Sequence, residues 1–168
     1  MKLLEETIAD LKGVPLEETL EPRLHTDRPA FLPETYVPDD EQKLELYRQL
    51  AVARKPERVD ELEAELADRF GTPPAPAREL LELRRLRLLG ARAHVSRLSI
   101  LGGTLELFLD QPLTPEQIHA VLTGTHLALE FLSGREMGMR LKTRPNTVLT
   151  EARILLEALV ACGSVRPK

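Results

Sequence analysis

The sequence predicts an α+β protein built in two parts. An N-terminal extended strap leads into a three-helix segment, and a ββαββα half follows in which helices cover an antiparallel sheet. Five prolines fall within residues 14–38, which argues against a long helix or a central strand there. Apolar residues recur at helical spacing through residues 39–92, and shorter stretches from residue 95 onward alternate between apolar and polar, as strands do.

The composition limits the classes of function. At 168 residues the chain is long enough to bury a sizeable core, and its 42% hydrophobic and 30% charged residues are ordinary for a globular protein. A net charge of −4 and few aromatic residues argue against a direct nucleic-acid partner. The single cysteine, Cys162, excludes an internal disulfide framework and fits a reducing compartment. No apolar run approaches the roughly 18 residues of a membrane span, so we expect a cytoplasmic protein without a membrane partner.

The first 38 residues are predicted to precede the compact domain. Residues 1–13 have apolar residues at helical spacing and a stop at Gly13, but no N-cap residue. We therefore expect a helix that links this chain to a preceding domain. Residues 14–38 should run extended as a proline-rich strap, with one short edge strand around Arg23–His25.

The compact α+β domain is expected to span residues 39–168. Its helical part covers residues 39–92, its ββαββα part residues 93–162, and a tail residues 163–168. The helical part contains three predicted helices with recognisable ends. They run from the N-cap Asp39, with Gln42 completing a capping box, to about Arg54, from Pro56 to Gly71, and from about Pro76 to Ala91.

The strands of the second half are predicted to form two hairpins. The first turns at Gly102-Gly103, which sets Leu101 opposite Thr104. That register brings four apolar residues to one face, where the last helix should cover them through Leu155 and Leu159. These four are Leu98, Ile100, Leu105 and Leu107.

The remaining elements follow from similar signals. Thr114 should cap a helix that continues with a first-turn proline. The second hairpin joins an alternating stretch from Leu127 to Phe131 with another from Met137 to Leu141, and a final helix should start at Asn146.

The second predicted helix is strongly acidic. Between Glu57 and Phe70 it holds six acidic residues and two arginines, a net charge of −4. Its apolar residues lie on one face, and Glu61, Glu65 and Asp68 lie on roughly the opposite one. Two interpretations follow: an ordinary solvated face, or an anionic surface held for a cationic partner.

The third predicted helix is basic. Five arginines against two glutamates give it a net charge of +3. The arginines near its end complement the helix dipole, so structural support is one interpretation. The alternative is a nucleic-acid-contacting patch made of Arg84, Arg85, Arg87 and Arg92, together with the basic segment Arg140, Lys142 and Arg144.

Motifs for catalysis are absent from the sequence. It contains no phosphate-binding loop of the G-x-x-x-x-G-K-[ST] type and no G-x-G-x-x-G fingerprint. Its four histidines and single cysteine lack the spacing of a zinc site. We therefore expect no enzymatic activity, no cofactor, no metal and no catalytic residue in this chain.

Four segments of the sequence resemble the C-terminal domain of the bacterial transcription-repair coupling factors (Mfd), and they occur in the same order along the chain. The most specific is Glu65-Leu66-x-Asp68-Arg69-Phe70-Gly71, and the similarity covers about residues 20–162. The others are Tyr36-Val37-Pro38-Asp39, then Lys43-Leu44-x-Leu46-Tyr47-Arg48-x-Leu50-Ala51, and Leu86-Arg87-Leu88-Leu89.

The resemblance implies a specific function. In this family the full-length factor is an ATP-dependent DNA translocase that displaces stalled RNA polymerase and recruits UvrA in transcription-coupled nucleotide excision repair. Its C-terminal domain is a regulatory clamp that packs on a UvrB-like domain, masks the UvrA-binding surface and restrains the motor. By resemblance, Glu65, Asp68 and Arg69, with the neighbouring Glu61, would contact that UvrB-like domain. UvrA and RNA polymerase would be reached only indirectly, through other domains.

Overall fold

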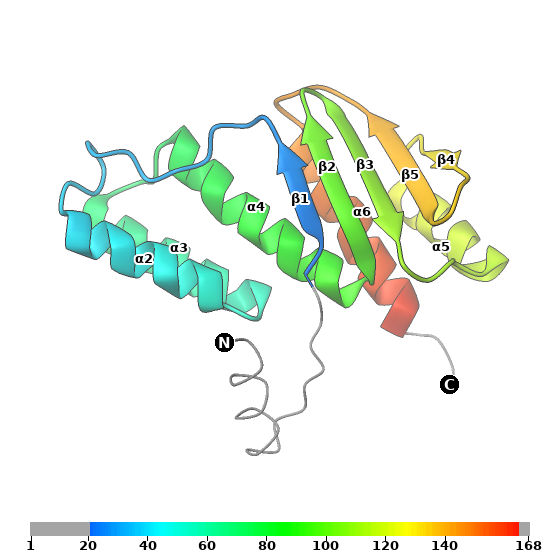
Figure 1. The fold of residues 1–168 in the computed structure, drawn as a ribbon, viewed down its shortest axis with the longest axis horizontal. Helices are drawn as coiled ribbons and strands as arrows, with labels where there is room; N and C mark the ends of the chain where they lie inside the picture. The colour runs from blue at the N-terminus through cyan, green and yellow to red at the C-terminus, as the bar shows by residue number, and fades with distance from the viewer. Residues whose placement is uncertain (1–20, 165–168) are drawn as a thin grey trace, which may run out of the picture.

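The computed structural model describes residues 21–164, so the helix expected at 1–13 and the end of the tail lie outside the described residues. The helices and strands of the described residues follow one another in the order that the sequence predicts (Figure 1). They are β1 (Arg23–Thr26), α2 (Asp40–Val52), α3 (Pro56–Phe70), α4 (Ala75–Arg92), β2 (Val95–Leu101), β3 (Thr104–Leu109), α5 (Pro115–Thr125), β4 (Glu130–Leu132), β5 (Met137–Lys142) and α6 (Val148–Ser164).

The strands form one five-stranded sheet in the order β1-β2-β3-β5-β4. The two predicted hairpins, β2–β3 and β4–β5, are confirmed, and the pair β3–β5 that joins them is antiparallel too. The register of the first hairpin is also confirmed: Leu101 lies opposite Thr104, and Leu98 lies opposite Leu107. The turn at Gly102-Gly103 therefore predicts the faces of residues 98–107 correctly.

The strap adds an edge strand to this sheet. The short strand predicted around Arg23–His25 is confirmed as β1, but it pairs with β2 in parallel, so the sheet is mixed. The hydroxyl of Thr26 in β1 donates a hydrogen bond of 2.7 Å to the carbonyl of Ile100 in β2. The strap is thus part of the sheet at this point, although its prolines keep it irregular further along.

A β-bulge changes the alternation that the sequence suggested for β2. The register shifts between Val95 and Arg97, which leaves Ser96 as the extra residue. Val95 therefore turns into the core instead of sharing the outer face with Arg97. The Ser96 hydroxyl hydrogen-bonds the Phe108 carbonyl at 3.2 Å and the Glu136 carboxylate at 2.9 Å.

Most helix ends agree with their sequence signals. Asp39 caps α2 by accepting a hydrogen bond from the backbone amide of Gln42, and Thr114 caps α5 with a complete capping box. Gly71 ends α3 with a φ of 92°, a conformation that favours glycine. The second half differs in two places: the last helix starts at Val148 and not at Asn146, and β4 covers only Glu130–Leu132.

Two hydrophobic cores share the helix α4. One lies between the sheet and the helices α4, α5 and α6, which lie behind the sheet in Figure 1. It contains the predicted group Leu98, Ile100, Leu105, Leu107, Leu155 and Leu159, all buried as expected. The other lies among the strap, α2, α3 and the same α4.

Truncation of Leu107 tests the first core. Leu107 is 0% exposed at the centre of the sheet, so Leu107→Ala should lower the free energy of unfolding by about 2–5 kcal/mol through lost burial and a residual cavity. Urea denaturation followed by circular dichroism measures this change. Leu101→Ala, at a residue that is 41% exposed on the neighbouring strand, is the control and should change it by no more than about 0.5 kcal/mol. Equal losses in the two variants would contradict the assignment of faces.

Candidate interaction surface on helix α3

The helix α3 has an inner apolar side and an outer charged side. Val59, Leu62 and Leu66 are buried in the second core. Their spacing of three and four residues places them on one face of the helix. On the outer side Glu61 and Asp68 are exposed and Glu65 is half-exposed, so the predicted carboxylates do lie together on one surface.

Neighbouring arginines partly neutralise this surface. Arg69 Nη1 lies 3.0 Å from Glu65 Oε2, and Arg58 Nη1 lies 3.0 Å from Glu61 Oε1. All four side chains are at least 40% exposed, so water and salt screen these pairs, and each contributes at most about 1 kcal/mol. Among the described residues Asp68 forms no ion pair. We call Glu61, Glu65, Asp68 and Arg69 the α3 stripe.

The remaining donors of Arg69 are available to a partner. Its guanidinium lies 5.1 Å from the centre of the Phe70 ring, a cation–π contact that orients the side chain. The α3 stripe therefore offers carboxylates and one positioned guanidinium from consecutive turns of a rigid helix. This set can engage arginines through the carboxylates and an acceptor through Arg69.

Two further acids of α3, Asp60 and Glu63, hold a buried arginine. Arg85 of α4 is 6% exposed. Its Nε donates to Asp60 Oδ1 at 2.7 Å, its Nη2 donates to Glu63, and its Nη1 donates to Glu82 Oε1 at 3.1 Å. Burial alone would lower the pKa of Arg85, but the hydrogen bonds that it donates to Glu63 and Asp60, together with the negative charges of Glu63 and Glu82, outweigh burial and raise that pKa. We call Arg85, Asp60, Glu63 and Glu82 the Arg85 cluster.

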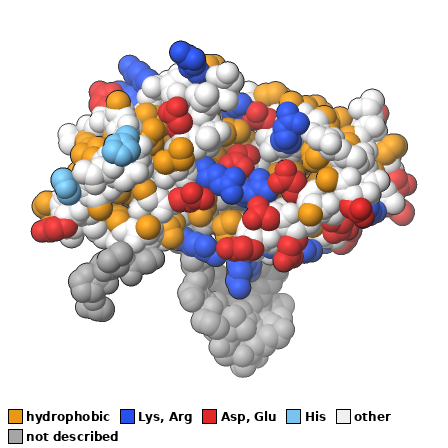
Figure 2. Space-filling view, turned by 180° about the vertical axis from the view of Figure 1, so that it is seen from behind, with side chains coloured by type: hydrophobic (Ala, Val, Ile, Leu, Met, Phe, Trp, Pro, Cys, Tyr) orange, Lys and Arg blue, Asp and Glu red, His pale blue; other side chains and the backbone are white. Residues whose placement is uncertain are grey.

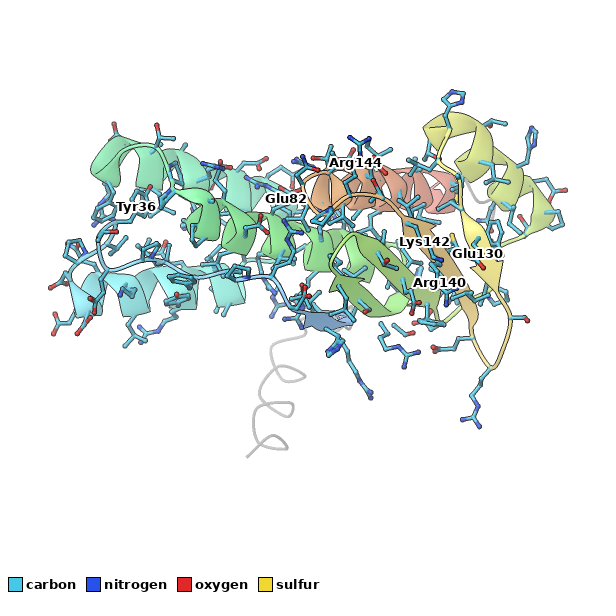
Figure 3. The ribbon with its side chains drawn as sticks, turned by 90° about the horizontal axis from the view of Figure 1, so that it is seen from above. Tyr36, Glu82, Glu130, Arg140, Lys142 and Arg144 are labelled. Atoms are coloured by element: carbon cyan, nitrogen blue, oxygen red, sulfur yellow. The ribbon has the colours of Figure 1, made fainter. Side chains whose placement is uncertain are left out.

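The Arg85 cluster also reaches α6. Arg153 Nη1 of α6 lies 3.5 Å from Glu82 Oε1, and Figure 3 shows Glu82 where α4 passes the start of α6. On the helical side of the molecule, cationic side chains gather near the centre and carboxylates surround them (Figure 2). The cluster ties the helix that carries the α3 stripe to the helices that cover the sheet.

The arginines of α4 do not form the nucleic-acid patch that the sequence left open. Arg84 makes two hydrogen bonds to Glu21, of 2.7 and 2.9 Å, and donates to the carbonyls of Ala51 and Ala53. Arg87 lies 3.7 Å from Glu21, and Arg92 lies 3.8 Å from Glu57. With Arg85 buried as well, each of the four faces a carboxylate of its own chain. The structural interpretation of this basic helix is therefore the one that the geometry supports.

Tyr36 of the strap fixes the end of α3. Its hydroxyl donates a 2.8 Å hydrogen bond to the carbonyl of Gly71, and its ring lies 5.7 Å from that of Phe70 at 59°. Burial, and then the negative charge of Glu63, raise the pKa of Tyr36 above its ordinary value. Figure 3 shows Tyr36 at the end of the helical part that is remote from the sheet.

The sequence held a signal for the Arg85 cluster that the patch hypothesis overlooked. Two successive helices with net charges of −4 and +3, joined by a short proline-rich loop, must pack close to one another. Their opposite charges then pair across the contact. The position of Arg85 among the leucines of α4 also marked it as inward-facing, since Leu81, Leu88 and Leu89 recur at helical spacing around it.

Within residues 21–164, no helix is both long enough and apolar enough to cross a bilayer. No group of three histidine, cysteine, aspartate or glutamate side chains among them is arranged to hold a metal ion.

Removal of Arg85 should be destabilising. Arg85→Ala removes charged hydrogen bonds to Asp60 and Glu63, whereas Glu82 keeps Arg153 as a partner. Because Asp60 and Glu63 are partly exposed to water, we expect the free energy of unfolding to fall by about 1.5–3 kcal/mol. Arg48→Ala removes an exposed i, i+3 pair with Glu45 and should cost no more than about 1 kcal/mol. Urea denaturation of both variants measures the difference. A loss in Arg85→Ala as small as that in Arg48→Ala would show that the cluster contributes little to folding.

Alkaline pH should weaken the fold through Tyr36. Because its pKa is higher in the folded chain, the unfolded chain loses the phenolic proton first as pH rises. The stabilisation is therefore complete below about pH 10 and falls as pH rises through the folded pKa. Tyr36→Phe should be less stable at pH 8 by about 0.5–1.5 kcal/mol and should show a shallower alkaline decline. Denaturation midpoints between pH 8 and pH 11 test this, with Tyr47→Phe as the control that retains Tyr36. An unchanged decline in Tyr36→Phe would refute this account of Tyr36.

Comparison with known proteins agrees with the resemblance in the sequence. The model of the TRCF domain matches residues 26–118, more than half of the chain. The transcription-repair-coupling factor of Myxococcus xanthus is 36% identical over 118 residues, which cover 66% of this chain and 10% of that protein. The corresponding factor of Escherichia coli K12 is 33% identical over 113 residues, or 63% of this chain and 10% of that protein.

A longer match and a solved structure extend the comparison. The factor of Staphylococcus haemolyticus is 26% identical over 162 residues, 94% of this chain and 13% of that protein. The chain thus spans about a tenth of the length of these relatives. The crystal structure of the C-terminal domain of a transcription-repair coupling factor superposes with a TM-score of 0.77 at 20% identity, covering 89% of this chain and 99% of that one. The chain therefore belongs to the transcription-repair coupling factor family and has the fold of that C-terminal domain.

Proposed function

We propose that this chain is a non-catalytic regulatory domain of a transcription-repair coupling factor. It docks through the α3 stripe onto the UvrB-like domain of the same protein, masks the surface that binds UvrA, and restrains the DNA translocase motor. Its contact with UvrA and RNA polymerase is indirect, through other domains. The observation that carries the proposal is the outward position of Glu61, Glu65, Asp68 and Arg69 on a helix of a chain in this family.

The charges of α3 support a cationic partner. Asp60 and Glu63 are each bound by Arg85 and are therefore less available to a second protein. The carboxylates of the α3 stripe are exposed, and only weak surface pairs must be broken before they meet another arginine. Glu65 and Asp68 lie three residues apart and can face one arginine cluster together. Docking then excludes water from these pairs and strengthens them.

The rigid support of α3 favours a clamp that opens and closes as one body. The Arg85 cluster holds the inner side of the helix, and Tyr36 holds its end. Because the α3 stripe does not need to fold on binding, little ordering entropy opposes docking. The restraint on the motor and the masking of the UvrA surface therefore end together when the charge pairs break.

Charge reversal of the α3 stripe tests the proposal. Glu65→Arg combined with Asp68→Arg places cations against a cationic partner surface, and like charges in such a contact cost several kcal/mol. We expect the double variant to lose binding to the isolated UvrB-like domain. In the full-length factor it should raise the basal ATPase rate and the affinity for UvrA together. Circular dichroism, steady-state ATPase assays and UvrA pull-down provide the readouts.

A matched variant on α2 controls for charge alone. Glu41 and Glu45 are exposed and four residues apart, so Glu41→Arg with Glu45→Arg changes the net charge by the same amount on another helix. This control should leave docking, ATPase rate and UvrA affinity unchanged. If the α3 variant is folded and both activities stay at the wild-type level, the α3 stripe is only a solvated face.

A further inference from the structure

The sheet has one face that no described helix covers. The helices α4, α5 and α6 all lie behind it in the view of Figure 1, and the face toward the viewer is bare. The strand register defines this open sheet face as three rows of residues across the strands. They are Arg23, Arg97, Phe108, Gly138 and Leu132; then His25, Ser99, Glu106, Arg140 and Glu130; then Leu101, Thr104 and Lys142.

The two carboxylates of this face are both engaged by one arginine. Arg140 Nε lies 2.9 Å from Glu106 Oε2, and Arg140 Nη1 lies 3.5 Å from Glu130 Oε1. Figure 3 shows Arg140 on β5 beside Glu130 of β4, with Lys142 further along the same strand. The middle row therefore has little free charge for a partner.

The other charged residues of the open sheet face are all cations. Arg23, Arg97 and Lys142 are exposed, and none of them meets a carboxylate within the described part of the chain. With the middle row included, the face has four cationic side chains against two carboxylates, a net charge of +2, although the whole chain has a net charge of −4. The fold has separated an anionic helix from a cationic sheet.

An aromatic side chain lies flat on this face beside two of the cations. A Cβ atom at Gly138 would come within 2.6 Å of Phe108 Cε2. The Phe108 ring therefore covers the glycine, and it can take this position only because residue 138 has no side chain. The guanidinium of Arg97 lies 4.3 Å from the centre of the same ring. Arg97 and Phe108 together form a cation–π stack, and Arg23 lies directly across from Arg97 in the next strand.

We propose that the open sheet face binds single-stranded nucleic acid. Arg23 and Lys142 contact phosphates, and a base stacks on the Arg97–Phe108 pair, because guanidinium planes and aromatic rings both accept bases. With strands about 4.8 Å apart and about 3.3 Å per residue, Arg23 and Lys142 stand roughly 20 Å apart diagonally. The Arg97–Phe108 pair lies in the same row as Arg23. This site is separate from the α3 stripe and goes beyond the proposed docking function.

A nucleic acid fits these residues better than an acidic protein segment does. An acidic segment supplies carboxylates for Arg23 and Lys142, but the carboxylate side chains themselves offer no aromatic ring for the Arg97–Phe108 pair. A single strand supplies both, with phosphates at regular intervals and a base attached at each. A duplex keeps its bases paired and stacked, so it can use the cations but not the stack.

Fluorescence anisotropy measures binding of a fluorescein-labelled single-stranded oligonucleotide. A length of about 12 nucleotides lies within the usual range for a single-strand site. Two phosphate contacts predict that log K falls with log salt at a slope of about −1.4. Arg23→Ala with Lys142→Ala should weaken binding at least about tenfold at low salt and flatten the slope. Phe108→Leu should weaken binding with the slope unchanged, because it removes stacking and no charge.

The control variant removes two arginines from the opposite side of the molecule. Arg58→Ala with Arg92→Ala makes the same change in net charge on exposed helical residues and should leave binding unchanged. Circular dichroism verifies that every variant is folded. The α3 stripe is intact in all of them, so failure here leaves the docking proposal standing.

Four results would overturn the inference. They are the absence of binding at low salt, an equal loss in the control variant, duplex bound at least as tightly as the single strand, and competition by polyglutamate as effective as by unlabelled oligonucleotide. The last of these would identify the open sheet face as a surface for an acidic protein.

Discussion

The helix α4 forms the common wall of both hydrophobic cores, and the rest of the structure depends on that arrangement. Leu83, Leu86 and Leu89 face the sheet, whereas Ala77 and Leu81 face the strap and α3. A helix buried on two sides has little surface left for solvated charges. Its arginines are therefore paired with carboxylates of the fold, and α3 and the start of the strap provide them.

The same constraint gives α3 its two-sided character. An acidic helix packed beside a helix without cations would have no reason to direct some of its carboxylates toward that neighbour and others toward water. Here one set is neutralised by a buried guanidinium and the other set faces outward, so the helix has a defined orientation as well as a charge. The Arg85 cluster thus separates the acids that stabilise the fold from those that can serve recognition.

Local chemistry explains why so much of the fold followed from the sequence. The glycine turn at Gly102-Gly103, the caps at Asp39 and Thr114, and the period of the apolar residues act within a few positions of one another. The partners of Arg85 and the parallel pairing of β1 depend on residues far apart in the chain, and no local pattern specifies them. The bulge at Ser96 was not predicted, because the sequence of β2 contains no break that would indicate an extra residue between Val95 and Arg97.

The parallel strand β1 has a consequence for the order in which the molecule assembles. The pairs β2–β3 and β4–β5 join neighbours in sequence, so they can form as soon as the chain collapses. The bond between Thr26 and Ile100 joins residues 74 positions apart, and the loop it closes contains α2, α3 and α4. Closing so long a loop costs entropy before any contact repays it. The edge of the sheet is therefore completed only after the helical part has docked, and this strand should be the last to gain protection from hydrogen exchange as the protein folds.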